Sequence, residues 1–366
     1  MPNTIFAQNG LFWHNGQIRL RRTAYLSGKH QNLFCPFCSN HFILHQKAYL
    51  ATDPLDMKKI MSVKSPASVG RLGGSVRLRR SGKKVLIFGK GGQLGYDLTR
   101  VFGLGYKLAA FDRSQADITN AQEVNNIILQ QQPWIVINAT AYNKVEAAEQ
   151  QKDLAFSINA KAVGNMAKTA EQVGAIFVHV STDYVFDGSK EFFTEEDEPN
   201  PLGLYGQSKL EGERLAKNNS SKLYLIRTSA VFGVKEGKQK MNFVDKMVSL
   251  AKEGRTLKVV NDQIISPTNS FDLACKIKEL IEKPAPFGVY HITNQGICSW
   301  YEFTLKILEL TNIKDEVLPI TSAESGGRVS RPKKSVLKNE ALEKAGLPPM
   351  PHWEDALRRY LDEKYK

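Results

Sequence analysis

The sequence predicts an α/β fold: a doubly wound, mainly parallel sheet with a smaller C-terminal lobe, behind a largely irregular N-terminal extension. From Lys83 onwards, short apolar runs alternate with amphipathic stretches, as strands and covering helices do in a parallel sheet. A glycine-rich turn follows the first of these runs, and such turns join a strand to a helix in nucleotide-binding sheets. A chain of 366 residues is also long enough for one large domain and a smaller lobe.

Five apolar runs are the candidate strands, namely Val85–Phe88, Leu108–Phe111, Trp134–Asn138, Ala175–Val180 and Leu223–Arg227. The stretch after Gln93 and residues 153–173 have helical spacing, so they can connect neighbouring strands by right-handed crossovers. We expect residues 83–230 to form the nucleotide-binding core of a sheet of about seven strands. Residues 231–366 contain more Pro and Gly breaks; we expect mostly a substrate-binding lobe, with some elements returning to the core.

The net charge of +13 does not by itself indicate a nucleic-acid partner. Residues 1–82 contain 12 Lys and Arg and only two acidic residues, whereas residues 83–366 contain 38 basic and 35 acidic residues. The body of the protein is therefore nearly neutral, and we expect no nucleic-acid partner. No apolar run approaches the roughly 20 residues that span a bilayer. Two of the four cysteines lie in the extension and two lie far apart in the body, which is no disulfide framework and fits a reducing compartment. The expectation is a soluble, cytoplasmic protein.

The extension, residues 1–82, has no sustained periodicity and contains a Gly- and Arg-rich stretch at 70–80. Acid-poor, Arg-containing N-termini occur in organellar transit peptides. A second interpretation is an over-long translation whose true start is Met57 or Met61. The sequence leaves both interpretations open.

Cys35, Cys38, His41 and His45 lie close together in the extension and are of the types that bind zinc. Structural zinc sites usually add a second, distant pair of ligands, which this segment lacks. We therefore expect no metal site. His179 and His291 each lie in an apolar run, and we expect both to be packed core residues rather than bases.

The glycine-rich turn consists of Gly89, Lys90, Gly91, Gly92, Gln93, Leu94 and Gly95. Glycines here allow a tight turn, let the backbone approach a pyrophosphate and let the helix pack closely on the strand, while the helix N-terminus favours an anion. After the second run stand Asp112 and Arg113. An Asp there binds the ribose hydroxyls of NADH, whereas Arg113 or Lys90 can pair with the 2′-phosphate of NADPH. We expect NADPH, with NADH as the alternative.

A Tyr and a Lys four residues apart, Tyr205 and Lys209, follow the run that ends in Ser181 and Thr182. This spacing puts both side chains on one helical face. The ammonium group is expected to lower the pKa of the phenol, so that Tyr205 can donate and accept a proton near neutral pH. Two other Tyr-x-x-x-Lys pairs, beginning at Tyr25 and Tyr360, lack the preceding Ser-Thr strand.

Together these residues resemble the dTDP-4-dehydrorhamnose reductases, a branch of the extended short-chain dehydrogenases with a Rossmann sheet. The resemblance covers about residues 84–360. It rests on the blocks Phe88–Gly95, Asn138–Glu149, His179–Phe186, Pro201–Glu213, Arg227–Ser229, Asn261–Thr268 and Arg331–Leu337. The stretch Ser-Thr-Asp-Tyr-Val-Phe at 181–186 is more diagnostic than the glycine turn, because related epimerases and dehydratases usually differ there.

The resemblance implies hydride transfer from the nicotinamide cofactor to the C4 ketone of a nucleotide-linked 6-deoxysugar, in dTDP-L-rhamnose synthesis. Tyr205 would donate the proton, Thr182 would hydrogen-bond the carbonyl oxygen, and Lys209 would hold the nicotinamide ribose. Further implied cofactor contacts are Asn138, Ala139 and Thr140. The implied substrate contacts are Thr182, Asp183, Tyr184, Asn242 and Arg331. The chemistry requires no metal.

Three positions depart from the family pattern. The usual Lys of the third strand block is Ala147, with Lys144 as a candidate substitute, the aromatic residue after Arg-Thr-Ser is Ala230, and the Asn of the Arg-Pro block is Lys334. These changes bear on the identity of the sugar more than on the reaction. Alternatives are a nucleotide-sugar epimerase or dehydratase, or a non-catalytic regulatory subunit of another enzyme; a homodimer is the expected assembly.

Overall fold

The computed structural model describes residues 13–14, 17–18, 82–234, 241–283 and 285–365. It divides into two units, residues 1–75 and 76–366, which are considered separately. In the first unit, strands β1 (Trp13–His14) and β2 (Gln17–Ile18) pair in antiparallel orientation. Cys35, Cys38, His41 and His45 lie outside the described residues.

The second unit is built on a sheet of six parallel strands in the order β12-β7-β6-β5-β3-β4. Five of them confirm the predicted strands: β3 (Lys84–Phe88), β4 (Lys107–Phe111), β5 (Ile135–Asn138), β6 (Ile176–Thr182) and β7 (Leu223–Thr228). The sixth, β12 (Gly288–His291), was not predicted. It returns from the C-terminal half to pair with β7, and in the described residues the sheet has six strands where we expected about seven.

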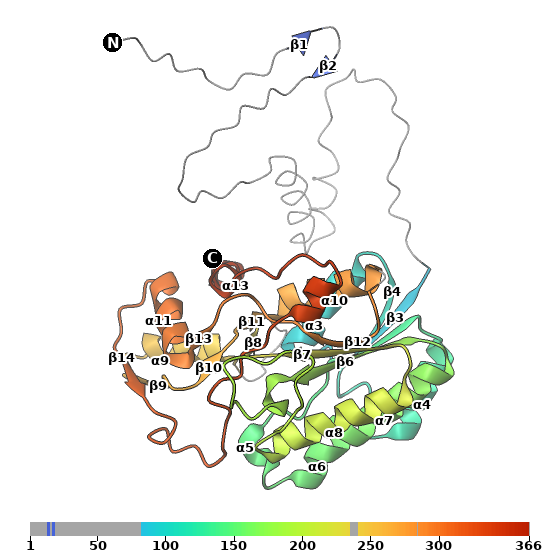
Figure 1. The fold of residues 1–366 in the computed structure, drawn as a ribbon, viewed down its shortest axis with the longest axis horizontal. Coiled ribbons are helices and arrows are strands. Elements are labelled where there is room, and N and C mark those ends of the chain that lie inside the picture. The colour runs from blue at the N-terminus through green and yellow to red at the C-terminus, as the bar shows by residue number, and fades with distance from the viewer. Residues whose placement is uncertain (1–12, 15–16, 19–81, 235–240, 284, 366) are drawn as a thin grey trace. The chain divides into compact units, whose positions relative to one another are not determined.

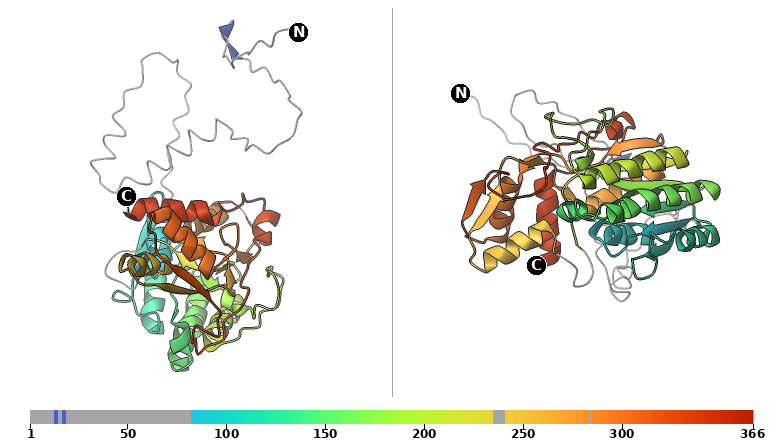
Figure 2. Two further views of the ribbon diagram at one scale, coloured as in Figure 1. Left: turned by 90° about the vertical axis from the view of Figure 1, so that its left-hand side faces the viewer. Right: turned by 90° about the horizontal axis from the view of Figure 1, so that it is seen from below.

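Helices cover both faces of this sheet, as the doubly wound fold requires (Figure 1). One face carries α3 (Gln93–Gly103) and α10 (Ser270–Glu282), with α12 (Glu340–Lys344) nearby. The other carries α4 (Ala121–Gln131), α7 (Ala162–Gln172) and α8 (Leu204–Asn219), which lie side by side in the right-hand view of Figure 2. Along β3, Val85 and Ile87 pack toward the first group and Leu86 and Phe88 toward the second. This alternation is what burial of both faces demands.

Short helices connect β5 to α7 on the side where the strands end. They are α5 (Val145–Ala148), α6 (Lys152–Phe156) and a π-helical turn, Ser157–Lys161, which runs directly into α7. The predicted helix over 153–173 is therefore one helical stretch with a π-helical segment. Such segments alter the direction of a helix locally.

The C-terminal lobe has its own apolar core and is more regular than its sequence pattern indicated. Its helices are α9 (Phe243–Lys252), α11 (Trp300–Thr311) and α13 (Trp353–Tyr365). Three pairs of short strands complete it: β8 (Val231–Phe232) with β11 (Thr268–Asn269), β10 (Ile264–Ile265) with β13 (Cys298–Ser299), and β9 (Leu257–Val260) with β14 (Val317–Ile320). Figure 1 shows α9, α11, β9 and β14 together at the left, beyond the ends of the main-sheet strands.

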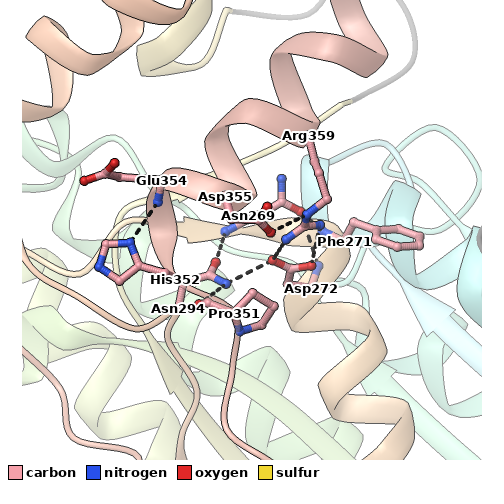
Figure 3. A network of polar contacts seen from close by, with 9 residues as sticks. All are labelled: Asn269, Phe271, Asp272, Asn294, Pro351, His352, Glu354, Asp355 and Arg359. Carbon is pink, nitrogen blue, oxygen red and sulfur yellow. Dashed lines mark hydrogen bonds and ion pairs between the residues drawn. The ribbon is translucent and has the colours of Figure 1, made fainter. Parts of the chain in front are cut away.

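An ion pair anchors the C-terminal helix to α10, which packs on the main sheet (Figure 3). The Arg359 guanidinium on α13 donates to both carboxylate oxygens of Asp272 on α10, at 2.9 and 2.8 Å. Asp272 also accepts from the Asn294 amide at 2.9 Å, and the Asn294 carbonyl accepts from the backbone N–H of Asn269 at 2.7 Å. These bonds tie together three segments: α13, the start of α10 and the loop at Asn294.

The two singled-out histidines are core residues, as the sequence predicted. His179 and His291 are fully buried, and burial holds the pKa of each below its ordinary value. Cys298 is buried in the lobe core and Cys275 packs against the core of the sheet. No helix in the described residues is long and apolar enough to cross a membrane.

Candidate active site

A cavity of about 820 Å³ opens where the parallel strands end. Residues that follow β3, β4, β5, β6 and β7 line one side of it, and the lobe contributes Val231, Ile265 and Trp300. Ligands of open parallel sheets bind outside the carboxyl ends of the strands. This cavity therefore has the position expected for a cofactor and a substrate together.

The glycine turn brings the backbone and α3 unusually close. Gly89 has a φ of 98°, and a Cβ there would lie 2.9 Å from the carbonyl carbon of Ala139. A Cβ at Gly95 would lie only 1.9 Å from the Gly89 carbonyl oxygen. Gly91, Gly92, Gln93 and Leu94 line the cavity, whereas Lys90 and Gly95 do not. Gly95 thus serves the packing of helix on turn that the sequence predicted.

The N-terminus of α3 faces this cavity without a competing anion. Its first turn contains no acidic residue, and among the described residues no side chain caps it. The buried Oε1 atom of Gln93, at the first helical position, has no hydrogen-bond partner in the described structure. Free backbone N–H groups and the helix dipole suit a pyrophosphate here. The residues present therefore fit a dinucleotide.

Asp112 and Arg113 line the far end of the cavity. The Asp112 carboxylate accepts from the backbone N–H and the hydroxyl of Ser114, and these bonds hold its pKa below the ordinary value. The Lys90 ammonium lies 3.8 Å from the same carboxylate. One carboxylate and two cations thus lie after the second strand of the fold, where a Rossmann sheet would hold an adenosine ribose.

The three predicted residues at the end of β5 lie in two different environments. Ala139 and Thr140 line the cavity, but Asn138 does not. The buried Asn138 side chain accepts from the backbone and the hydroxyl of Thr140, at 3.0 and 2.5 Å. The structure therefore places Asn138 behind the wall, where it orients Thr140 rather than reaching a ligand.

Thr182, Tyr205 and Lys209, the three candidate catalytic residues, all line the cavity. Thr182 ends β6, and α8 carries the other two on one face. The Lys209 ammonium is buried and donates to the Val180 carbonyl at 2.7 Å. Burial lowers its pKa to about 8, and the Glu213 carboxylate opposes this shift.

The expected lowering of the Tyr205 pKa does not occur in this structure. Burial raises it to about 12, although a hydrogen bond with Thr182 acts in the opposite direction. The physical reason is that the phenol is desolvated while the Lys209 ammonium is engaged by the Val180 carbonyl. Tyr205 is consequently a protonated donor over the whole physiological pH range.

Asp183 and Tyr184 also line the cavity, and they make different contacts there. The buried Asp183 carboxylate accepts from the hydroxyls of Thr182 and Ser229, at 2.9 and 2.7 Å. The Tyr184 ring packs edge-on against Tyr205, with centroids 5.8 Å apart. Asp183 therefore fixes Thr182 in place, and Tyr184 forms part of the wall around Tyr205.

Two predicted substrate contacts lie elsewhere. Asn242 does not line the cavity; its side chain caps α9 by accepting from the Asp245 N–H at 2.8 Å and donates to the Tyr360 hydroxyl at 2.8 Å. Arg331 is outside the lining as well and forms an ion pair with Glu146 at 3.0 Å. Burial raises the pKa of Tyr184, and the positive charge of Arg331 partly opposes this rise.

Comparison with known proteins identifies the family. The family model described as the RmlD substrate binding domain matches residues 83–366. The chain belongs to the dTDP-4-dehydrorhamnose reductase family. It is 34% identical to dTDP-4-dehydrorhamnose reductase of Escherichia coli K12 over 298 residues, which cover 77% of this chain and 98% of the relative. It is 40% identical over 283 residues to the spore coat polysaccharide biosynthesis protein SpsK of Bacillus subtilis, with 77% and 98% covered.

Solved structures agree with this family. The crystal structure of dTDP-4-dehydrorhamnose reductase from Bacillus anthracis in complex with NADP has a TM-score of 0.74 and 39% identity, and the match covers 77% of this chain and all of that one. UDP-glucose 4-epimerase from Thermus thermophilus has a TM-score of 0.65 but only 18% identity. At that identity the likeness shows a shared fold and nothing more.

Of the three positions that depart from the dTDP-4-dehydrorhamnose reductase family pattern, one lines the cavity. Lys144 lines it and Ala147 does not, so the structure puts the substitute lysine on the cavity wall. Ala230 lines it as well, with a φ of 44°, a conformation that is unfavourable for a residue other than glycine. Lys334 instead pairs with Glu191 at the surface, at 3.2 Å.

Sequence reasoning missed the lobe side of the cavity. Ile265 and Trp300 reach it from segments far along the chain, and neither carries a local signal of binding. Glu213 was also missed as an individual residue, although it continues the spacing of Tyr205 and Lys209 along the same face of α8.

Proposed function

We propose that this protein is an NADPH-dependent reductase that converts the C4 ketone of dTDP-4-dehydrorhamnose to the alcohol. The observation that carries the proposal is the position of Thr182, Tyr205 and Lys209, which line one cavity with the glycine turn. The relatives named dTDP-4-dehydrorhamnose reductase support the substrate, and the NADP complex of a relative supports the cofactor.

The cofactor would extend along the strand ends. The glycine turn and the N-terminus of α3 would hold its pyrophosphate, and Lys209 its nicotinamide ribose. At the adenosine end, Lys90 and Arg113 would pair with a 2′-phosphate while Asp112 binds a ribose hydroxyl. The bound dinucleotide supplies the hydride that this chemistry needs.

The residues of the chain handle the proton. Tyr205 remains protonated because its pKa is about 12, so it can donate to the oxygen as the alcohol forms. Thr182 forms a hydrogen bond with Tyr205, and the Thr182 hydroxyl donates to the Asp183 carboxylate. To donate to the substrate carbonyl, Thr182 would turn that hydrogen away from Asp183. Lys209 contributes positive charge that stabilises the forming phenolate.

The substrate would lie against the lobe. Val231, Ile265 and Trp300 provide an apolar wall, and Lys144 provides a cation for the diphosphate. Ala230 leaves room where a large side chain would narrow the cavity. A cytoplasmic location and a homodimeric assembly belong to the same proposal; sedimentation of the purified protein measures the assembly directly.

The test is the stoichiometry of cofactor consumption. Purified full-length protein is incubated with enzymatically generated dTDP-4-dehydrorhamnose and NADPH, then with NADH. We expect one NADPH oxidised per dTDP-rhamnose formed. Conversion of a nucleotide sugar without net NADPH oxidation would instead indicate an epimerase or dehydratase. Cofactor binding with no conversion of the sugar would indicate a regulatory subunit.

A further inference from the structure

Glu213 connects α8 to β6, which ends in Thr182, and to β7, which ends in Thr228 on the cavity wall. Its carboxylate is fully buried, one helical turn beyond Lys209. The Oε1 atom accepts from the Ser181 hydroxyl at 2.5 Å. The Arg227 guanidinium donates to the same carboxylate from Nε, at 3.1 and 3.2 Å, and from Nη2, at 2.7 Å. Ser181 precedes Thr182 on β6, and Arg227 precedes Thr228 on β7.

Among the described residues, Glu213 is the anion whose charge acts on Lys209. Burial lowers the pKa of His179 far enough that the ring is neutral, and Tyr205 is a neutral phenol because its pKa is about 12. Arg227 is the direct ion-pair partner of Glu213. Lys217, on the next turn of α8, also interacts with Glu213. In the described structure the Glu213 charge thus acts on Lys209 from within the same helix.

We propose that Glu213 is a positioning residue of the reductase, which holds α8 against the strand ends and keeps Lys209 as an ammonium ion at neutral pH. The inference rests on the proposed function for its meaning in catalysis. It stands on geometry: one buried carboxylate binds β6 and β7 immediately before Thr182 and Thr228, and lies one turn from the cation that faces the cavity.

A purely structural ion pair would have a different signature. Loss of a structural contact lowers cofactor binding to a similar extent at every pH. Loss of the Glu213 charge lowers the pKa of Lys209, because a carboxylate favours the charged ammonium and burial opposes it. The defect should therefore be large at alkaline pH and small at acidic pH.

The experiment compares Glu213→Gln with Glu211→Gln in the full-length protein. Glu211 lies on the exposed side of the same helix, near Arg214, so it provides a matched removal of charge. NADPH binding is followed by fluorescence from pH 6 to 9, and kcat/KM over the same range. For Glu213→Gln we expect NADPH binding about fivefold weaker at pH 8, about tenfold weaker at pH 9 and near that of wild type at pH 6, which corresponds to a downward shift of about one unit from the Lys209 pKa of about 8. Glu211→Gln should follow wild type throughout.

Two results would overturn the proposal: a pH dependence of NADPH binding in Glu213→Gln that coincides with wild type, or an equal loss at every pH. If Glu213→Gln does not fold, Glu213→Gln combined with Arg227→Met removes the anion without leaving a buried guanidinium unpaired. A smaller shift in the same direction is then expected, because the cation of Arg227 is lost with the anion. The binding readout separates the two proposals. Wild-type protein that binds NADPH but does not reduce the sugar refutes the proposed function, whereas the pH dependence of binding still decides the role of Glu213.

Discussion

The ammonium nitrogen of Lys209 lies 2.7 Å from the carbonyl oxygen of Val180, two residues before Thr182 on the same strand. This bond holds the lysine at the floor of the cavity, where burial lowers its pKa to about 8. Lys209 is therefore a cation beside the cavity at neutral pH, and it loses its proton as the pH rises through about 8.

The first prediction concerns pH. As the pH rises through about 8, Lys209 loses its proton, and the positive charge that holds the cofactor and stabilises the phenolate is lost. We expect kcat/KM to fall along an alkaline limb centred near pH 8. Because the pKa of Tyr205 is about 12, that residue cannot produce this limb. In Lys209→Arg the guanidinium stays charged, so remaining activity should show no limb below pH 9; an unchanged limb would assign it to another group.

Removal of the Tyr205 hydroxyl should abolish proton donation while preserving the site. In Tyr205→Phe the ring still packs edge-on against Tyr184, so we expect NADPH affinity within about threefold of wild type. Turnover should fall by about 10²- to 10⁴-fold, the usual contribution of a positioned acid. Steady-state kinetics and fluorescence titration measure both quantities. Turnover close to wild type would remove Tyr205 from the mechanism.

The glycine turn can be tested with a matched pair of alanine substitutions. In Gly95→Ala the new Cβ would lie 1.9 Å from the Gly89 carbonyl oxygen, so the turn must move. We expect NADPH affinity to fall more than about tenfold, at about 1.4 kcal/mol per factor of ten. Gly105→Ala is the control, because nothing lies within 4 Å of its added Cβ. Equal NADPH affinity in the two variants would show that the turn does not position the cofactor.

The link between α13 and the core should contribute measurably to stability. Arg359→Met removes two hydrogen bonds to the carboxylate of Asp272, which is largely buried (Figure 3). We expect the free energy of unfolding to fall by about 1–2 kcal/mol, since Arg359 itself is partly exposed. Arg358→Met, at an exposed neighbouring position, should change it by less than about 0.5 kcal/mol. Urea denaturation of both variants measures these changes. Equal denaturation midpoints in the two variants would show that the ion pair between Arg359 and Asp272 does not stabilise the fold.

The sequence predicted the sheet, and it singled out three residues that line one cavity, because these signals are local. Strands β3, β5, β6 and β7 are buried on both faces, and the edge strand β4 is half-buried, so each contains a short apolar run. Strand β12 is short and depends on its pairing with β7, which no local pattern reports. The helices of the lobe did carry a signal that was overlooked: Ser299 and Glu302 form a capping box at the start of α11, and this spacing is visible in the sequence.

The remaining site features depend on burial and distant packing. The raised pKa of Tyr205 and the lowered pKa of Lys209 arise from desolvation, which spacing along a helix cannot reveal. The polar side chain of Asn242 caps α9. A family resemblance does not distinguish this role from substrate binding. Trp300 reaches the cavity only because the lobe folds back over the strand ends.

The most direct test of the central claim follows a single atom. The protein is given dTDP-4-dehydrorhamnose and NADPH that carries deuterium at the transferable position of C4 of the nicotinamide, and the product is analysed by NMR and mass spectrometry. The account predicts dTDP-rhamnose with one deuterium at C4 of the sugar. A product without deuterium, or with deuterium at another carbon, would contradict reduction of the C4 ketone by this protein.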